Sequence, residues 1–130
     1  CRFVIRSESI MAQTIPPALE QELQKFDTMR RNHETLVAMS QTLQAELTEI
    51  KGTLEELKKQ SDDVVTYKAV GQVMFKVEKP AVQEELEDRQ KTIEMRLAST
   101  SKQTEKLAEQ LKELQSKIEI ELSKRNLRLQ

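Results

Sequence analysis

Residues 64–77 read VVTYKAVGQVMFKV and differ in composition from the sequence on either side of them. They are rich in β-branched residues, contain a Tyr and a Phe, and carry one glycine, Gly71, near their centre. β-branched and aromatic residues favour strands, and a central glycine favours a tight turn because it tolerates positive φ. The stretch therefore predicts a β-hairpin over about residues 64–78.

Two registers of this hairpin are open. A two-residue loop pairs Lys68 with Phe75 or with Val73, and Gly71 then occupies a primed turn. A three-residue loop over residues 70–72 places the more apolar side chains on one face, namely Val65, Tyr67, Ala69, Val73, Phe75 and Val77. We expect the three-residue loop because it separates apolar from polar side chains.

A heptad pattern occupies residues 16–60, before the hairpin. Alternating spacings of three and four keep a narrow stripe of side chains facing one partner helix, which predicts a coiled coil. Pro16 and Pro17 suit a first helical turn, and Asp62 and Asp63 follow the last one. The core positions are Leu19, Glu22, Phe26, Met29, His33, Leu36, Ser40, Leu43, Leu47, Ile50, Leu54 and Leu57.

A second heptad pattern follows the hairpin over about residues 80–128. Pro80 fits its opening turn, and acidic residues precede basic ones along it, as the helix dipole favours. Pairs spaced i,i+4, such as Glu85 with Arg89 and Glu113 with Lys117, add support. The core positions are Leu86, Gln90, Ile93, Leu97, Thr100, Thr104, Leu107, Leu111, Leu114, Ile118, Glu121 and Arg125.

Together these patterns predict a mainly α fold in which two long helices form an antiparallel coiled coil joined by one β-hairpin. Both chain termini would then lie together at the tip of the coiled coil. With 3 % aromatic residues and 33 % charged residues, the chain has little material for a thick core. A lone hairpin is marginally stable, so we expect strands of other chains to complete it.

Composition also excludes several classes of function. The net charge is −1, with 21 basic and 22 acidic residues interspersed, so no nucleic-acid or membrane partner is indicated. The single cysteine, Cys1, fits a reducing compartment and predicts a cytoplasmic location. His33 has no second histidine or cysteine near it, and a rod offers no concave site for paired carboxylates. We therefore expect no enzyme activity, no catalytic residue, no metal and no cofactor.

The first ten residues do not fit the helical pattern. Residues 1–10 precede Met11, Ala12 and Gln13, which read like an ordinary translation start. We interpret residues 1–10 as an N-terminal extension of doubtful origin and residues 11–130 as the folded domain.

Three short motifs resemble prefoldin β-type subunits: Ile15-Pro16-Pro17, Asp62-Asp63 before the hairpin, and Tyr67-Lys68-Ala69-Val70-Gly71 at its start. The resemblance covers about residues 11–128. The archaeal β subunits are most similar in these motifs, and eukaryotic subunit six is next. The last motif in its helix-flanked setting is fairly specific, whereas the heptads alone are not.

The resemblance implies an ATP-independent chaperone in which hairpins of two α-type and four β-type subunits form a platform of intersubunit β-barrels. Such a hexamer holds unfolded proteins at its coil tips, prevents their aggregation and delivers them to a group II chaperonin. In this chain, subunit assembly would involve Val65, Tyr67, Ala69, Val73, Phe75 and Val77. Client contact would involve apolar residues near both termini, namely Ile15, Ala18, Leu19, Leu23, Phe26, Leu122, Leu127 and Leu129.

The residues by themselves leave alternatives open. Leu23, Leu122 and Leu129 lie outside the heptad core, so we expect that a two-helix contact does not bury all of them. Alternatively, they close the tip or are scattered surface residues. Tyr67 and Phe75 alternatively pack only within the hairpin. A structural coiled-coil adaptor that binds fixed partner helices is the second function class, although it has no need of an apolar hairpin.

Overall fold

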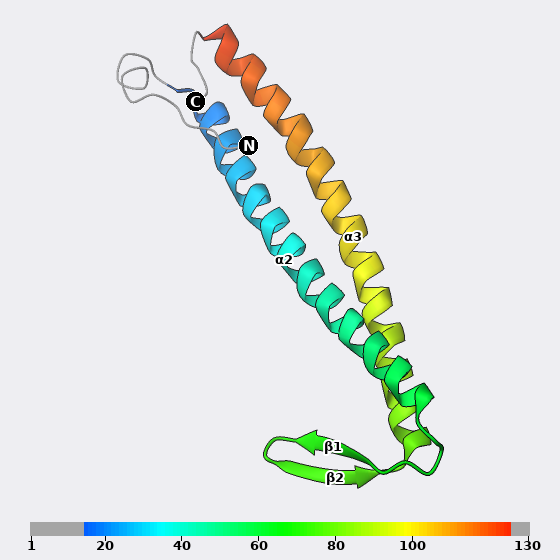
Figure 1. The fold of residues 1–130 in the computed structure, drawn as a ribbon. Helices are drawn as coiled ribbons and strands as arrows, with labels where there is room; N and C mark the ends of the chain where they lie inside the picture. The colour runs from blue at the N-terminus through cyan, green and yellow to red at the C-terminus, as the bar shows by residue number, and fades with distance from the viewer. Residues whose placement is uncertain (1–14, 126–130) are drawn as a thin grey trace. The chain divides into compact units, whose positions relative to one another are not determined.

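The computed structural model describes residues 15–125, which form two long helices and one β-hairpin (Figure 1). Helix α2 spans Pro17–Lys59, strands β1 and β2 span Thr66–Val70 and Val73–Val77, and helix α3 spans Lys79–Lys124. The predicted fold class is confirmed. The predicted extension over residues 1–10 and the predicted client-contact residues Leu127 and Leu129 lie outside the described residues. No helix in the described part is long and apolar enough to cross a membrane.

The chain divides into two compact units. The terminal unit holds described residues 15–37 and 103–125, and the hairpin unit holds residues 38–102. Each unit contains a segment of α2 and a segment of α3. In the terminal unit, Lys25 lies opposite Lys117, whereas Leu36 lies opposite Leu107, so the helices are antiparallel there.

The buried residues of both units follow the predicted heptads. In the hairpin unit the core consists of Leu43, Leu47, Ile50, Leu54 and Ile93. In the terminal unit it consists of Leu19, Phe26, Ile118 and Leu122. All of these except Leu122 are predicted core positions. Full burial of one such side chain contributes about 1.5–3 kcal/mol, so the two seams supply most of the hydrophobic stabilisation of these helices.

The end of α2 is held by a lysine from the start of α3. The Lys79 side chain is 8 % exposed, and its Nζ donates a hydrogen bond of 2.8 Å to the backbone oxygen of Gln60. The same Nζ lies 3.4 Å from Asp62 Oδ1. Carbonyls at a helix end lack intrahelical donors, so Lys79 satisfies one of them. The sequence offers no local signal for this contact, because Lys79 and Gln60 are far apart along the chain.

The hairpin has a two-residue loop. Val70 pairs with Val73, Lys68 with Phe75, and Tyr67 with Lys76, which leaves Gly71 and the following glutamine as the loop. The expected three-residue loop is therefore wrong, and the open alternative that pairs Lys68 with Phe75 is confirmed. Gly71 has a φ of 61°, which primed turns require at their first loop position and which matches the twist of the strands.

This register changes which side chains share a face. Cross-strand partners lie on the same face, so Tyr67 and Phe75 lie on opposite faces of the hairpin. Face one carries Thr66, Lys68, Val70, Val73, Phe75 and Val77. Face two carries Tyr67, Ala69, Met74 and Lys76. The expectation of a single apolar face is wrong, because it assumed that polarity alone sets the register.

Candidate functional site

The hairpin surface is the largest collection of exposed apolar side chains among the described residues. Its large apolar residues are between 52 % and 67 % exposed, namely Val65, Tyr67, Val70, Val73, Met74 and Phe75. Of the other predicted assembly residues, Ala69 is also exposed and Val77 is half-buried. Apolar side chains lie on both faces of the two-stranded sheet. Exposed apolar side chains gathered on one short segment make the hairpin a candidate interaction surface.

One polar contact joins the hairpin to α3, and another closes the base of the hairpin itself. Lys68, on face one, makes an ion pair of 2.6 Å with Glu85 of α3. The Thr66 hydroxyl donates a hydrogen bond to the Val77 backbone oxygen across the base of the sheet. Both of these residues are half-buried, whereas Val70 and Val73 at the loop end are exposed. The hairpin that carries the exposed apolar side chains is thus linked to α3 by the Lys68–Glu85 ion pair.

The predicted client-contact residues fall into three groups. Leu19, Phe26 and Leu122 are buried, with 3 %, 5 % and 1 % of their surface exposed. Ile15 and Leu23 are half-buried and pack against the same core cluster. Ala18 is exposed. The structure therefore brings all of these residues except Ala18 into or against one cluster, in which three of them are buried.

Leu122 is buried although it lies outside the heptad core. Of the three residues not all expected to be buried, Leu122 is among the most buried of the structure, Leu23 is half-buried, and Leu129 lies outside the described residues. Leu122 lies one helical turn after Ile118 and joins the same cluster, against which Leu23 also packs. The buried interface between the helices of the terminal unit therefore includes residues besides the two core positions of each heptad.

Ile120 is an exposed apolar residue that the heptad reasoning missed. It is 57 % exposed and lies between Ile118 and Leu122 in α3, within the terminal unit. The signal in the sequence is an isoleucine between two glutamates, Glu119 and Glu121, at a position outside the heptad core. Because successive helix positions are about 100° apart, Ile120 lies on the side of α3 away from Ile118 and Leu122 and adds exposed apolar surface there.

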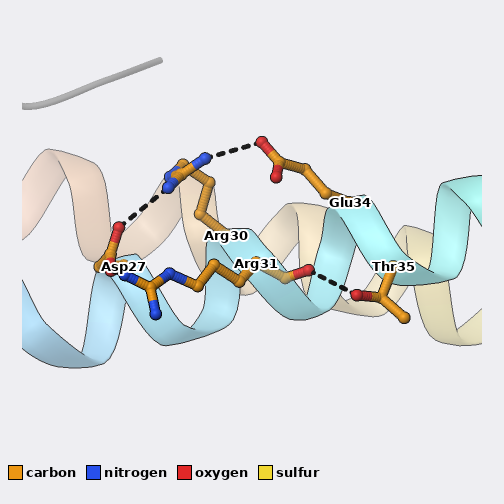
Figure 2. Close-up of polar contacts among 5 residues, drawn as sticks. All are labelled: Asp27, Arg30, Arg31, Glu34 and Thr35. Carbon is orange, nitrogen blue, oxygen red and sulfur yellow. Dashed lines mark hydrogen bonds and ion pairs between the residues drawn. The ribbon is translucent and has the colours of Figure 1, made fainter.

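Charged residues in the α2 segment of the terminal unit neutralise one another (Figure 2). Arg30 bonds to Asp27 at 3.0 Å and to Glu34 at 2.7 Å, and Arg31 bonds to Asp27 at 2.8 Å. The hydrogen bond that Arg30 donates to Asp27, and then the charge of Glu34, raise the pKa of Arg30. The Thr35 hydroxyl donates to the Arg31 backbone oxygen. Because each cation has an acidic partner, this segment does not form a basic patch.

Open grooves run along the seam of the terminal unit. One has a volume of about 440 Å³ and lies beside Phe26, His33, Leu111 and Lys112. Another, of about 520 Å³, lies beside Met29 and Leu114. They offer apolar contact flanked by long polar side chains. These grooves are therefore lined by both apolar and polar side chains.

Comparison with known proteins agrees with this architecture. A family model described as "Prefoldin subunit" matches residues 20–125. Prefoldin subunit beta of Pyrococcus furiosus is 36 % identical over 110 residues, covering 85 % of this chain and 94 % of the relative. The protein of that name from Thermococcus gammatolerans is 41 % identical over 110 residues, with coverage of 85 % and 94 %. In Saccharolobus islandicus the identity is 38 % over 114 residues, with coverage of 88 % and 90 %.

A solved structure has the same fold. The crystal structure of the prefoldin beta subunit from Thermococcus strain KS-1 superposes with a TM-score of 0.75 at 36 % identity. The match covers 85 % of this chain and 96 % of that chain. The matched region includes both helices and the hairpin, so the resemblance found in the motifs extends to the whole described fold. The chain therefore belongs to the prefoldin family of chaperone subunits, as a relative of the β-type members.

Proposed function

We propose that this chain assembles through its hairpin with α-type and other β-type subunits into a hexamer of two α and four β chains. The hexamer holds unfolded proteins without ATP and without enzyme activity, prevents their aggregation and delivers them to a group II chaperonin. The hairpin surface is the observation that carries this proposal. We also propose a cytoplasmic location, which is supported by the low cysteine content.

The hairpin surface supports assembly in two ways. Its strands have only each other as neighbours among the described residues, so the outer edge of each is available to a strand from another chain. Each large apolar side chain on it is about half exposed, and covering that half contributes roughly 1 kcal/mol. A platform of intersubunit β-barrels would use both the edges and the faces.

The terminal unit supports client binding. Five of the proposed contact residues belong to one apolar cluster or pack against it, and Ile120 adds an exposed apolar side chain on another side of α3. Hydrophobic attraction is non-directional, so such a surface can bind unfolded segments without sequence preference. The adaptor alternative is disfavoured, because fixed helical partners leave the apolar hairpin without a role.

Assembly is tested by mixing the chain with an α-type prefoldin subunit and measuring the mass of the product. Phe75→Asp places a charge on face one and is expected to abolish the hexamer. Met95→Asp is the matched control, because Met95 is 73 % exposed on α3 and should leave the hexamer intact. Co-elution of the Phe75 variant at full hexamer mass would contradict the assembly role.

Client holding is tested with the wild-type hexamer and a chemically denatured client diluted into buffer without ATP. Light scattering should stay low in the presence of the hexamer and rise in its absence. A stable monomer or dimer that gives no protection would favour the adaptor.

A further inference from the structure

A carboxylate occupies a core position of the terminal unit. Glu22 lies between Leu19 and Phe26 along α2, at a heptad position that faces α3. Its Oε1 lies 3.4 Å from Nζ of Lys117, while its side chain is 23 % exposed and that of Lys117 is 68 % exposed. Its Oε2 is fully buried and has no hydrogen-bond partner within the described residues. The carboxylate is therefore largely removed from water with only one oxygen paired.

This arrangement weakens the closed form of the terminal unit. A buried acceptor without a partner loses its hydration and gains nothing in return. An ion pair with an exposed lysine offsets only a small part of that loss. If the first turns of α2 move away from α3, water can hydrate both carboxylate oxygens. Glu22 thus favours separation of α2 from α3, whereas an apolar residue at this position would favour their contact.

Opening at Glu22 would uncover the apolar cluster around it. Leu19 and Phe26 are each less than 6 % exposed, and their partners Ile118 and Leu122 are 0 % and 1 % exposed. Three of these four are proposed client-contact residues. In the closed form they contact each other, so they can bind a client only after the helices separate.

The core of the hairpin unit contains no comparable carboxylate in its α2 segment. Apart from the half-buried Ser40, its core positions there are apolar and buried, namely Leu43, Leu47, Ile50, Leu54 and Leu57. Among the core positions of α2, a carboxylate is therefore found only in the terminal unit.

We propose that Glu22 keeps the terminal unit close to opening, so that α2 and α3 separate there and expose Leu19, Phe26, Ile118 and Leu122 to an unfolded polypeptide. This inference rests on the proposed chaperone function and names the element of the chain that makes the binding surface accessible. Glu22 controls access to the binding surface and does not itself bind the client.

The test measures hydrogen exchange of residues 17–29 in the assembled hexamer by mass spectrometry. Glu22→Leu completes the apolar core, and exchange is expected to slow by about tenfold or more, the effect of removing a buried unpaired acceptor. Lys117→Met removes the partner of the carboxylate and should speed exchange. Gln24→Leu is the control, since it adds the same side chain to an exposed position in the same segment.

The same variants are then assayed for suppression of client aggregation. Glu22→Leu should hold less client than wild type, whereas Gln24→Leu should not lose holding capacity. Unchanged exchange in Glu22→Leu, or slower exchange with full client holding, would overturn the inference while leaving the chaperone function in place. Failure of the wild-type hexamer to protect the client would instead contradict the proposed function.

Discussion

Arg89 of α3 donates two hydrogen bonds to the same carboxylate oxygen of Glu46 on α2, from Nε at 2.9 Å and from Nη2 at 2.6 Å. This contact joins the two helices of the hairpin unit. The predicted pairing of Arg89 with Glu85 along α3 is wrong, because Glu85 pairs with Lys68 of the hairpin. Likewise Lys117 pairs with Glu22 and not with Glu113. Where two helices pack side by side, a long side chain beside the seam reaches the facing helix as easily as the next turn of its own helix.

The Glu46–Arg89 pair should show measurable coupling. In a double-mutant cycle of Glu46→Ala and Arg89→Ala, we expect a coupling free energy of about 0.5–1 kcal/mol, modest because both side chains are partly exposed. The cycle is measured by urea unfolding at low salt. Coupling should decrease when the salt concentration is raised, because exposed charges are screened. Coupling that does not depend on salt would show that the pair stabilises the helices by packing alone.

Lys79 should be required for the stability of the end of α2. Lys79→Met keeps most of the apolar stem but leaves the Gln60 carbonyl without its donor, which should lower the free energy of unfolding by about 1–3 kcal/mol. Hydrogen exchange in the last turn of α2 should also accelerate. Lys76→Met is the control, because Lys76 is exposed on face two of the hairpin. Equal stability of the two variants would show that the Lys79 contact contributes nothing.

Much of the fold could be predicted because the decisive signals are local. The heptads placed Leu47 and Ile93 in the core, and the β-branched stretch with one glycine placed the hairpin. The register could not be decided by polarity, since face two is as exposed as face one in the single chain. The burial of Leu122 and the cap by Lys79 depend on contacts between distant residues. The partners in those contacts come from another segment of the chain, so the residue pattern of one segment does not reveal them.

The two glycines should respond in opposite directions to substitution by alanine. Gly71 has a φ of 61°, so Gly71→Ala should destabilise the chain by about 1 kcal/mol although nothing lies within 4 Å of the added methyl group. Gly52 is exposed inside α2 with equally open space, so Gly52→Ala should stabilise the chain by about 0.5–1 kcal/mol. Thermal unfolding of both variants checks the signs. Equal effects would contradict the two-residue turn.

Substitutions of Ile120 and Leu122 should separate client binding from structural stability, although the two residues lie only two positions apart in α3. Ile120 is 57 % exposed, so Ile120→Ser should change the free energy of unfolding by no more than about 0.5 kcal/mol. Leu122 is 1 % exposed, so Leu122→Ser should cost about 3 kcal/mol or more through the cavity and the buried hydroxyl. Circular dichroism melts of the two variants measure this difference.

The aggregation assay then assigns the roles of the two residues. Ile120→Ser should weaken suppression of client aggregation while the hexamer mass and the melting temperature stay at their wild-type values. Leu122→Ser should weaken suppression together with loss of helix in the terminal unit, so its effect does not identify a contact. For the same reason, serine substitutions of the buried Leu19 and Phe26 cannot identify client contacts by loss of activity alone. Full suppression by the Ile120 variant would remove Ile120 from the client-binding surface.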